Sequence, residues 1–366
     1  MRMTTKQYET FLQLVRLGIG TSKGVTISKD IDWEKLKSLS DAQGLSAIIL
    51  DALNTDGHLT DTMPVQMKLE WIGEVLRSYE QRHRAYVKAI SSLAGFYNQH
   101  GFKMMVLKGY ACSLDWPKPE HRPCGDVDIW QFGQWKEADK ALEASFKIQD
   151  PGFKIDNSHH HHTVFEWRGF TVENHYDFVN IYAHKSSREL EKVFKELGQD
   201  GSYWVKENGE KVYLPSPNLH ALFLIRHMVS HFAAAEITVR QVLDWAFFVE
   251  KHTKEIDWNW LKRVLEDYHM KEFFNIINAI CVEDLGFKSE IFPSVKFNPM
   301  LKERVLNDIL GPKYGTVEIK GLIKRVVYKY QRWQGNAWKH KMCYGESRWG
   351  TFWTGVWAKM LKPSSL

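Results

Sequence analysis

Two short stretches of the chain carry the residue types that phosphate and metal chemistry require. An apolar run ends in Lys108-Gly109, and a second apolar run contains Asp126-Val127-Asp128. Side chains alternate along a strand, so we expect Asp126 and Asp128 on one face, roughly 6–7 Å apart. Paired carboxylates repel each other and suit Mg²⁺, which takes hard oxygen ligands. Lys108 would add charge for a phosphate, and Gly109 would let that phosphate approach the backbone.

This combination resembles a bacterial family of uncharacterised nucleotidyltransferases within the DNA polymerase β-type superfamily. That family shows Leu-Lys-Gly, then Arg-x-x-Gly-Asp-[Ile/Val]-Asp, then Glu-x-His, and later an Arg-His pair and an Arg…Asp pair on helices. The chain matches these features at Leu107-Lys108-Gly109, Arg122 with Gly125-Asp126-Val127-Asp128, Glu173-Asn174-His175, Arg226-His227, and Arg240 with Asp244. The resemblance covers roughly residues 80 to 285.

The resemblance implies an Mg²⁺-dependent or Mn²⁺-dependent enzyme that uses an NTP such as ATP as its donor. It would move a nucleoside monophosphate to a hydroxyl acceptor, which could be a small molecule, a protein side chain or an RNA end. Asp126, Asp128 and Glu173 would be the catalytic residues and the metal ligands. The residues implied to bind the nucleotide are Lys108, Gly109, Arg122, Gly125 and His175.

Several of these roles leave alternatives open. Arg122 could clamp a phosphate or pair with the acids, and His175 could orient a carboxylate or simply be structural. If Glu173 faced away from the Asp pair, Glu166 would be the next candidate. The chain has Gly109-Tyr110 where better-known polymerase β-type enzymes have Gly-Ser or Gly-Gly, so a serine contact to phosphate is lost. Ser113 is the nearest hydroxyl.

Other histidines are also candidates for metal binding. His227 and His231 have the i, i+4 spacing of metal ligands on a helix, but Met228 stands where a zinc-protease motif would have Glu. A polar seam that also contains Arg226 and an Arg240–Asp244 pair is the alternative interpretation. The run of four histidines at 159–162 predicts an exposed loop that binds Ni²⁺ or Zn²⁺ adventitiously.

The elements around these motifs predict an α+β fold. We expect a small mixed-sheet nucleotidyltransferase-like core, flanked by N-terminal helices and a helical C-terminal domain. The predicted organisation is an N-terminal helical region at 1–100, a catalytic α/β domain at 101–215, a helical domain at 216–310 and a basic tail at 311–366.

Hydrophobic periodicity gives the individual elements. Strands are predicted at 103–107, 126–130, 163–168, 170–176, 203–206 and 211–214. Helices are predicted along 5–100 and at 109–116, 135–146, 187–197, 218–234, 236–252, 257–268, 270–284, 298–310 and 317–340. Asp32 is a predicted helix cap, and Asn208-Gly209 is the predicted turn of a hairpin.

Composition sets outer limits on the protein. The 366 residues are 44% hydrophobic and 25% charged, enough apolar residues for a real core. We expect no transmembrane segment, because no uncharged apolar run reaches the length of a spanning helix. The four cysteines are far apart and form no CxxC pair, which is typical of a reduced, cytoplasmic protein without a zinc site.

The C-terminal tail differs from the rest of the chain. Residues 320–366 carry ten Lys or Arg and one acid, a net +9, so the preceding residues carry −4. The tail also holds five of the fifteen tryptophans, at 333, 338, 349, 353 and 357. The simplest expectation is that most of these indoles pack on the body while the basic groups reach water. The alternative is an anionic partner, either RNA or a membrane surface.

Two other functions therefore stand beside nucleotidyl transfer. One is a catalytically degenerate module that only binds nucleotide. The other is a nucleic-acid-binding or membrane-binding protein that acts through residues 320–366.

Overall fold

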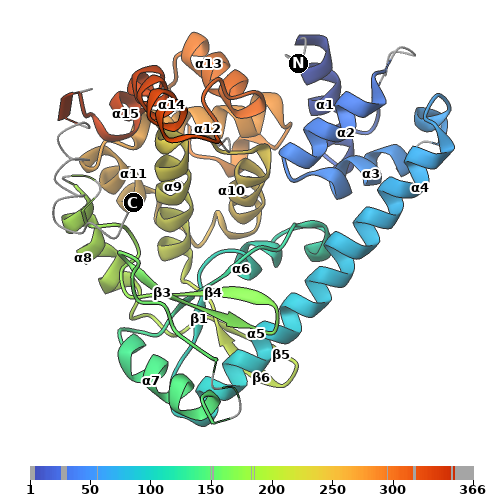
Figure 1. Cartoon of the computed structure of the whole chain (residues 1–366). Coiled ribbons are helices and arrows are strands. Elements are labelled where there is room, and N and C mark those ends of the chain that lie inside the picture. The colour runs from blue at the N-terminus through green and yellow to red at the C-terminus, as the bar shows by residue number, and fades with distance from the viewer. Residues whose placement is uncertain are drawn as a thin grey trace.

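The computed structural model of the chain has a helical body stacked on a small α/β layer (Figure 1). Helices from both ends of the sequence form the body, and the segment between them forms the sheet. The structure describes residues 5–25, 31–55, 57–148, 150, 152–182, 184, 186–294, 296–315, 319–347 and 349–350.

The sheet has six strands in the order β3-β4-β2-β1-β6-β5. The pairs β2–β4 and β1–β6 are parallel, and the other neighbours are antiparallel, so the predicted mixed sheet is confirmed. The strands are β1 (Met105–Val106), β2 (Val127–Trp130), β3 (His162–Trp167), β4 (Phe170–His175), β5 (Trp204–Glu207) and β6 (Glu210–Tyr213).

Two helices cover one face of this sheet. Helix α5 (Arg82–Gln99) continues α4 (Val65–Glu74) through a π-helical stretch, Val75–Gln81, and the long rod runs from the helical body to the sheet (Figure 1). It packs with α7 (Trp135–Phe146) against alternate strand residues, which include Val127 and Ile129. Because strand side chains alternate, the intervening Asp128 faces the opposite side, toward the helical body.

The N-terminal helices are α1 (Thr5–Gly18), α2 (Trp33–Ala42) and α3 (Ser46–Thr55). Inside the sheet domain lie α6 (Tyr110–Ser113) and α8 (Ser187–Leu197). The C-terminal helices are α9 (Pro217–Ala234), α10 (Val239–His252), α11 (Trp258–Asp267), α12 (Lys271–Ala279), α13 (Pro299–Leu310), α14 (Leu322–Gly335) and α15 (Ala337–Tyr344).

The two groups of helices share one hydrophobic core although they lie far apart in the sequence. Phe11 and Leu36 belong to the same buried cluster as Leu222 and Ile276. The buried side chain of Gln43 links the groups further, because its Nε2 donates to the carbonyl of residue 309 and its Oε1 accepts the N–H of residue 239. The N-terminal helices are therefore part of the platform that holds α10.

Local predictions were most accurate where turn and cap chemistry is explicit. Asp32 caps α2 by accepting a hydrogen bond from the N–H of Lys35. Asn208 and Gly209 both have positive φ (47° and 92°), as the turn between β5 and β6 requires. None of the helices in the described part of the chain is long and apolar enough to cross a membrane.

The C-terminal tail differs from its prediction in two ways. The single helix predicted over 317–340 is wrong, because the chain breaks at Asn336 between α14 and α15. Gly335 stands at this break, where any side chain would overlap the ring of Tyr314. Of the tail tryptophans, Trp333 and Trp338 are half-buried and Trp349 is 62% exposed, while residues 353 and 357 lie outside the described residues. Deep packing is therefore wrong for Trp349.

Candidate active site

Parallel pairing of β2 with β4 places two acidic residues side by side. Asp128 on β2 is in register with Glu173 on β4, so both side chains lie on the sheet face toward the helical body. One ligand atom each of Asp128, Glu173 and His175 lies within 4.8 Å of the other two. Glu166 is exposed and accepts a hydrogen bond from Thr171, away from this group.

The side chain of Asp128 is fully buried, and only one of its two carboxylate oxygens has polar partners among the described residues. Its Oδ1 lies 2.9 Å from the Lys108 ammonium and 3.0 Å from Nε2 of His175. Its Oδ2 has no hydrogen-bond partner among the described residues. A buried, unpartnered carboxylate oxygen is costly, and such an atom in a native protein points to a missing ligand or ion.

The charges around Asp128 shift one another's titration. Burial alone would raise the pKa of Asp128, but Lys108 and the hydrogen bond from His175 outweigh it and hold that pKa far below its usual range. Burial alone would lower the pKa of His175, whereas its hydrogen bonds to Asp128 and Glu173 raise that pKa to about 9. The pKa of Lys108 is likewise raised by Asp128 and Asp126 against burial. The acids are thus balanced by two fixed cations.

Asp126 stands just before β2 and is half-buried. Burial and the neighbouring Asp128 carboxylate raise its pKa. Its backbone carbonyl accepts a hydrogen bond of 2.8 Å from the Tyr86 hydroxyl on α5. The same hydroxyl fills the space beside Gly109, which has a φ of +59°. Gly109 is therefore needed both for its backbone conformation and for the close approach of Tyr86.

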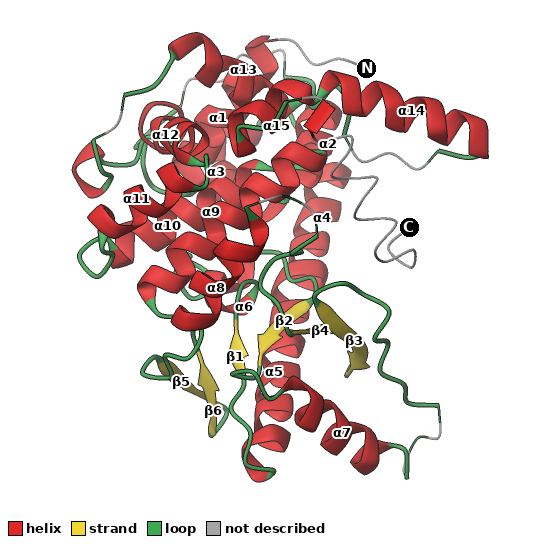
Figure 2. Cartoon of the chain, turned by 90° about the vertical axis from the view of Figure 1, so that its left-hand side faces the viewer, coloured by secondary structure: helices red, strands yellow, loops and turns green. Residues whose placement is uncertain are grey.

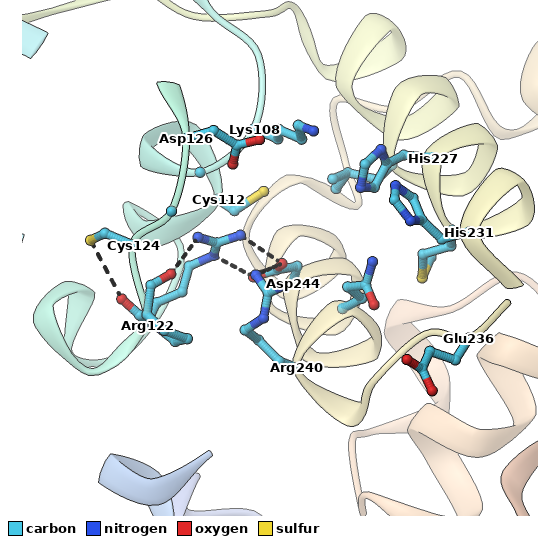
Figure 3. A pocket seen from close by; sticks show the side chains of 16 residues that line it. Lys108, Cys112, Arg122, Cys124, Asp126, His227, His231, Glu236, Arg240 and Asp244 are labelled. Atoms are coloured by element: carbon cyan, nitrogen blue, oxygen red, sulfur yellow. Dashed lines mark hydrogen bonds and ion pairs between the residues drawn. The ribbon is translucent and has the colours of Figure 1, made fainter. Parts of the chain in front are cut away.

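A cleft of about 470 Å³ lies between the segment that connects β1 to β2 and helices α9 and α10 (Figure 3). Lys108 and Asp126 lie on one wall, and His227 and His231 of α9 lie opposite (Figure 3). Gly109, Arg122, Gly125, Glu236, Arg240 and Asp244 also line the cleft. Basic groups that open onto a cleft beside carboxylates suit a phosphorylated ligand with a bound cation.

Arg122 pairs with Asp244 of α10 and not with the acids of β2. Its Nε and Nη2 donate to the two oxygens of Asp244 at 2.7 and 2.9 Å, and its Nη1 donates to the carbonyl of Pro123. The indole N–H of Trp116 also donates to Asp244. The predicted i, i+4 pair of Arg240 and Asp244 is present, with 3.8 Å between charged atoms. This network fixes the loop before β2 to the helical body.

The remaining histidines form two groups. The rings of His227 and His231 lie 4.3 Å apart in the cleft, and burial, then the charge of Lys108, lowers the pKa of each. In the 159–162 run, His159 is exposed but His162 is buried and lies opposite His175 in the β3–β4 register. Burial lowers the pKa of His161 to about 2 and that of His162 to about 4. The expectation of a fully exposed loop is therefore wrong at its C-terminal end.

The sequence did not reveal that Tyr86 lies beside Gly109 or that His162 lies opposite His175. It predicted Arg240 as the only ion-pair partner of Asp244, whereas Arg122 pairs with Asp244 as well. Tyr86 is one of several aromatic residues in a long helical pattern, so nothing in the sequence marks it as the neighbour of Gly109. The Arg122–Asp244 pair joins residues 122 positions apart. Only the tertiary structure brings such partners together.

The residues present fit the divalent cation that the sequence motifs imply. Asp128 and Glu173 supply hard oxygen atoms at neighbouring positions, and Asp128 Oδ2 is buried without a protein partner in the described part of the chain. Asp126 faces the cleft next to them and could share the cation with a nucleotide.

Comparisons with known proteins show which family the chain belongs to. A family model described as "Uncharacterised nucleotidyltransferase" matches residues 29–286, so the chain belongs to that family. A crystal structure of an antigenic nucleotidyltransferase-like protein from Paracoccidioides brasiliensis is similar at 13% identity and a TM-score of 0.34, over 56% of this chain and 95% of that one. Among curated proteins, none matches the chain. The family that the motifs suggested is thus confirmed.

Proposed function

We propose that this protein transfers a nucleoside monophosphate from an NTP to a hydroxyl acceptor, with Mg²⁺ or Mn²⁺ bound by Asp126, Asp128 and Glu173. The observation that carries the proposal is the buried Oδ2 of Asp128, which lacks a partner among described residues, although Asp128 is in register with Glu173 and its Oδ1 contacts Lys108 and His175. Membership of a nucleotidyltransferase family supports the same conclusion.

The reaction forms one phosphorus–oxygen bond and breaks another. The acceptor oxygen attacks the α-phosphorus of the NTP, the bond to the β-phosphate breaks, and pyrophosphate leaves. The hydroxyl proton passes to a carboxylate, for which Glu173 is the proposed acceptor, because it is held ionised: burial would raise its pKa, but the hydrogen bond from His175 outweighs burial and lowers it. A bound divalent cation would neutralise the negative charge that develops on the phosphate oxygens.

Lys108 and Gly109 would hold the triphosphate. Lys108 is 19% exposed and lines the cleft while one of its N–H groups faces Asp128, so its other donors can reach a phosphate oxygen. Gly109 adds no side chain at the same wall. Arg122, in contrast, has all three nitrogens engaged by protein acceptors, so its proposed part is to position the loop that carries Asp126.

The direct test supplies the full-length protein with each α-labelled NTP, Mg²⁺ or Mn²⁺, and cell lysate, and then identifies the labelled product. Transfer of label to one class of acceptor, with release of pyrophosphate, is the expected result. Nucleotide binding measured by calorimetry without any transfer would favour the catalytically degenerate module. Absence of both binding and transfer in the wild-type protein would overturn the proposal.

A second candidate function concerns α14, which projects from the helical body (Figure 2). Val326, Val327 and Tyr330 on this helix are 57%, 49% and 56% exposed. Its basic residues are Lys324, Arg325, Lys329 and Arg332, and no acidic residue lies among them. Exposed apolar and basic groups on one helix suit an anionic surface, RNA or lipid.

Substitutions on α14 test this second function better than deletion of the tail. Helix α15 packs into the body through Met342, Cys343 and Tyr344, so deletion would remove part of the core. Charge reversal at Lys324, Arg325 and Lys329 leaves α15 intact. Loss of salt-sensitive binding to RNA or to anionic vesicles is the expected result, and unchanged binding would reject a role for α14.

A further inference from the structure

Three histidine side chains converge beside the carboxylates, and two of them, His161 and His162, have no part in the proposed nucleotidyl transfer. One ring nitrogen each of His161, His162 and His175 lies within 4.8 Å of the other two. The ring centroids are 4.4 Å apart for His161 and His162, and 5.2 Å apart for His162 and His175. We propose that these three imidazoles form a binding site for a transition-metal cation of the Zn²⁺ class.

The backbone holds these residues in place. Antiparallel pairing of β3 with β4 puts His162 directly opposite His175 on the same face of the sheet. The carbonyl of His161 accepts the N–H groups of Tyr176 and Asp177 at 2.9 and 3.1 Å. The end of the histidine run is therefore fixed to β4 by the sheet and by the turn that follows it. His159, by contrast, is exposed.

Their ring nitrogens are available to a metal. Nδ1 of His161 and Nδ1 of His162 are buried, and neither has a hydrogen-bond partner within the described ranges. Nδ1 of His175 lies 3.2 Å from the carbonyl of Asp177, to which it can donate. A backbone carbonyl that fixes one nitrogen of a histidine leaves the other for a metal, a common arrangement in metal sites. Nε2 of His175 is then the ligand atom, and a bound metal would replace the proton that this nitrogen shares with Oδ1 of Asp128 at 3.0 Å.

The carboxylate of Glu173 lies beside this histidine site, although its proposed part is in nucleotidyl transfer. Its Oε2 lies 3.8 Å from Nδ1 of His162 and 3.7 Å from Nε2 of His175. Ligand atoms bound to Zn²⁺ at about 2.0–2.1 Å from the ion would be roughly 3.3 Å apart. The three ring nitrogens lie within 4.8 Å of one another, so they would approach by about 1.5 Å at most to bind the ion. Imidazole nitrogens suit Zn²⁺, Ni²⁺ and Cu²⁺, whereas Mg²⁺ takes oxygen ligands. The histidine site and the Asp126–Asp128 pair should therefore select different cations.

The test titrates metal-free full-length protein with Zn²⁺ against a competing chelator. We expect one tight site per chain and a loss of affinity of at least about tenfold in His161→Gln and in His162→Gln, since even a group that only orients a ligand contributes this much. His159→Gln, from the exposed part of the run, should bind Zn²⁺ as the wild type does. So should His227→Gln from the other histidine group, and Asp126→Asn from the carboxylate site.

X-ray absorption at the zinc edge of the wild-type protein provides a second measurement that needs no variant. Three imidazoles around the ion are expected. One or two imidazoles would overturn the proposal, whether or not the buried His162→Gln variant folds. Equal loss of affinity in His159→Gln and His162→Gln would also overturn it, because the run would then bind metal as an unstructured chelator. Loss in Asp126→Asn would assign the Zn²⁺ to the carboxylate site instead.

Discussion

Two buried carboxylates lie at the cleft or next to it, and their hydrogen-bond partners differ. Asp244 lines the cleft, and Asp128 contacts Lys108, which lines it. Asp244 on α10 has both oxygens bonded: Arg122 donates to each, and the Trp116 indole donates to one. In Asp128 on β2, only Oδ1 has partners, namely the Lys108 ammonium and Nε2 of His175. Its Oδ2 has no hydrogen-bond partner in the part of the chain that the structure describes.

We interpret this difference as one between a structural ion pair and the proposed binding site. A buried carboxylate whose lone pairs are all used by fixed donors has nothing left to offer a ligand, and its contribution is to hold elements together. A buried carboxylate with a free oxygen carries an uncompensated cost that a cation can remove. We therefore expect substitutions at Asp244 to act on stability, and substitutions at Asp128 to act on metal and nucleotide binding.

The largest effect is expected from Asp128→Asn. Removing this charge should abolish Mn²⁺–nucleotide binding in calorimetry and lower nucleotidyl transfer by about 1000-fold, since metal stabilisation of a phosphoryl transition state is worth several kcal/mol. The matched control is Asp139→Asn on α7, whose carboxylate bonds Thr163 and Asn174 on the other sheet face. Equal activity in the Asp128 and Asp139 variants would show that Asp128 has no special part in metal binding or transfer.

Asp244→Asn should destabilise the protein by about 3 kcal/mol, because it leaves the buried Arg122 charge without its partner. Urea unfolding measures this change. The double variant Arg122→Met/Asp244→Leu should recover part of the stability, because the charge and its partner are both gone. If Asp244→Asn left the free energy of unfolding unchanged, the pair would not be structural.

Gly109→Ala is expected to destabilise the protein by about 1–2 kcal/mol, through its positive φ and the overlap of the new methyl group with the Tyr86 hydroxyl. Tyr86→Phe in the same chain should relieve the overlap but not the backbone strain. Gly125→Ala is the matched control, since a methyl group there meets no atom within 4 Å. Thermal unfolding should show the largest loss of stability for Gly109→Ala, a smaller loss when Tyr86→Phe is added, and the smallest for Gly125→Ala. An equal loss of stability at both glycines would contradict this prediction.

The smallest effect is the pH dependence of protein stability that the buried His220 contributes. Burial lowers the pKa of His220 to about 4, while the charges of Asp115, His252, Asp244 and Arg122 partly offset one another. Between about 4 and 6.5 the unfolded chain binds this proton and the folded chain does not, so stability falls as pH falls through this window. His220 should contribute a loss of about 1 kcal/mol between pH 7 and about pH 5.5.

Urea unfolding at several pH values tests this contribution against His220→Gln. The variant should show a flatter dependence of stability on pH across the window. His220 packs on Phe248 with its Nε2 3.7 Å from the Cys112 sulfur, so Gln fills much of the same space. A pH dependence identical to that of the wild type would show that another group carries the acid sensitivity.

Much of the fold could be predicted because its signals are local. The Asn208-Gly209 turn, the Asp32 cap and the alternation around Val127 and Ile129 each depend on residues within a few positions of one another. The break at Asn336 was missed. It directly follows Gly335, where the ring of Tyr314 leaves no room for a side chain, a contact that the helical pattern does not reveal.

The candidate site was predictable in its residue types but not in its partnerships. The Asp-x-Asp spacing places Asp126 and Asp128 at strand positions of the same parity, and this follows from backbone geometry alone. Which acid lies next to Asp128 depends on the β2–β4 pairing, which a single sequence does not specify; that pairing brings Glu173 into register. Arg122 could equally have joined the metal-site acids, and the docking of α10 gave it Asp244 instead.

The sequence by itself thus determined the family and the strand that carries Asp128, with Asp126 just before it, because motifs and alternation act over short distances. The tertiary structure alone decided that Asp128 keeps an oxygen without a partner among the described residues, that Asp244 does not, and that His162 faces His175. Each of these outcomes depends on groups brought together from distant parts of the chain, since burial and pairing energies exist only once the sheet and helices have packed.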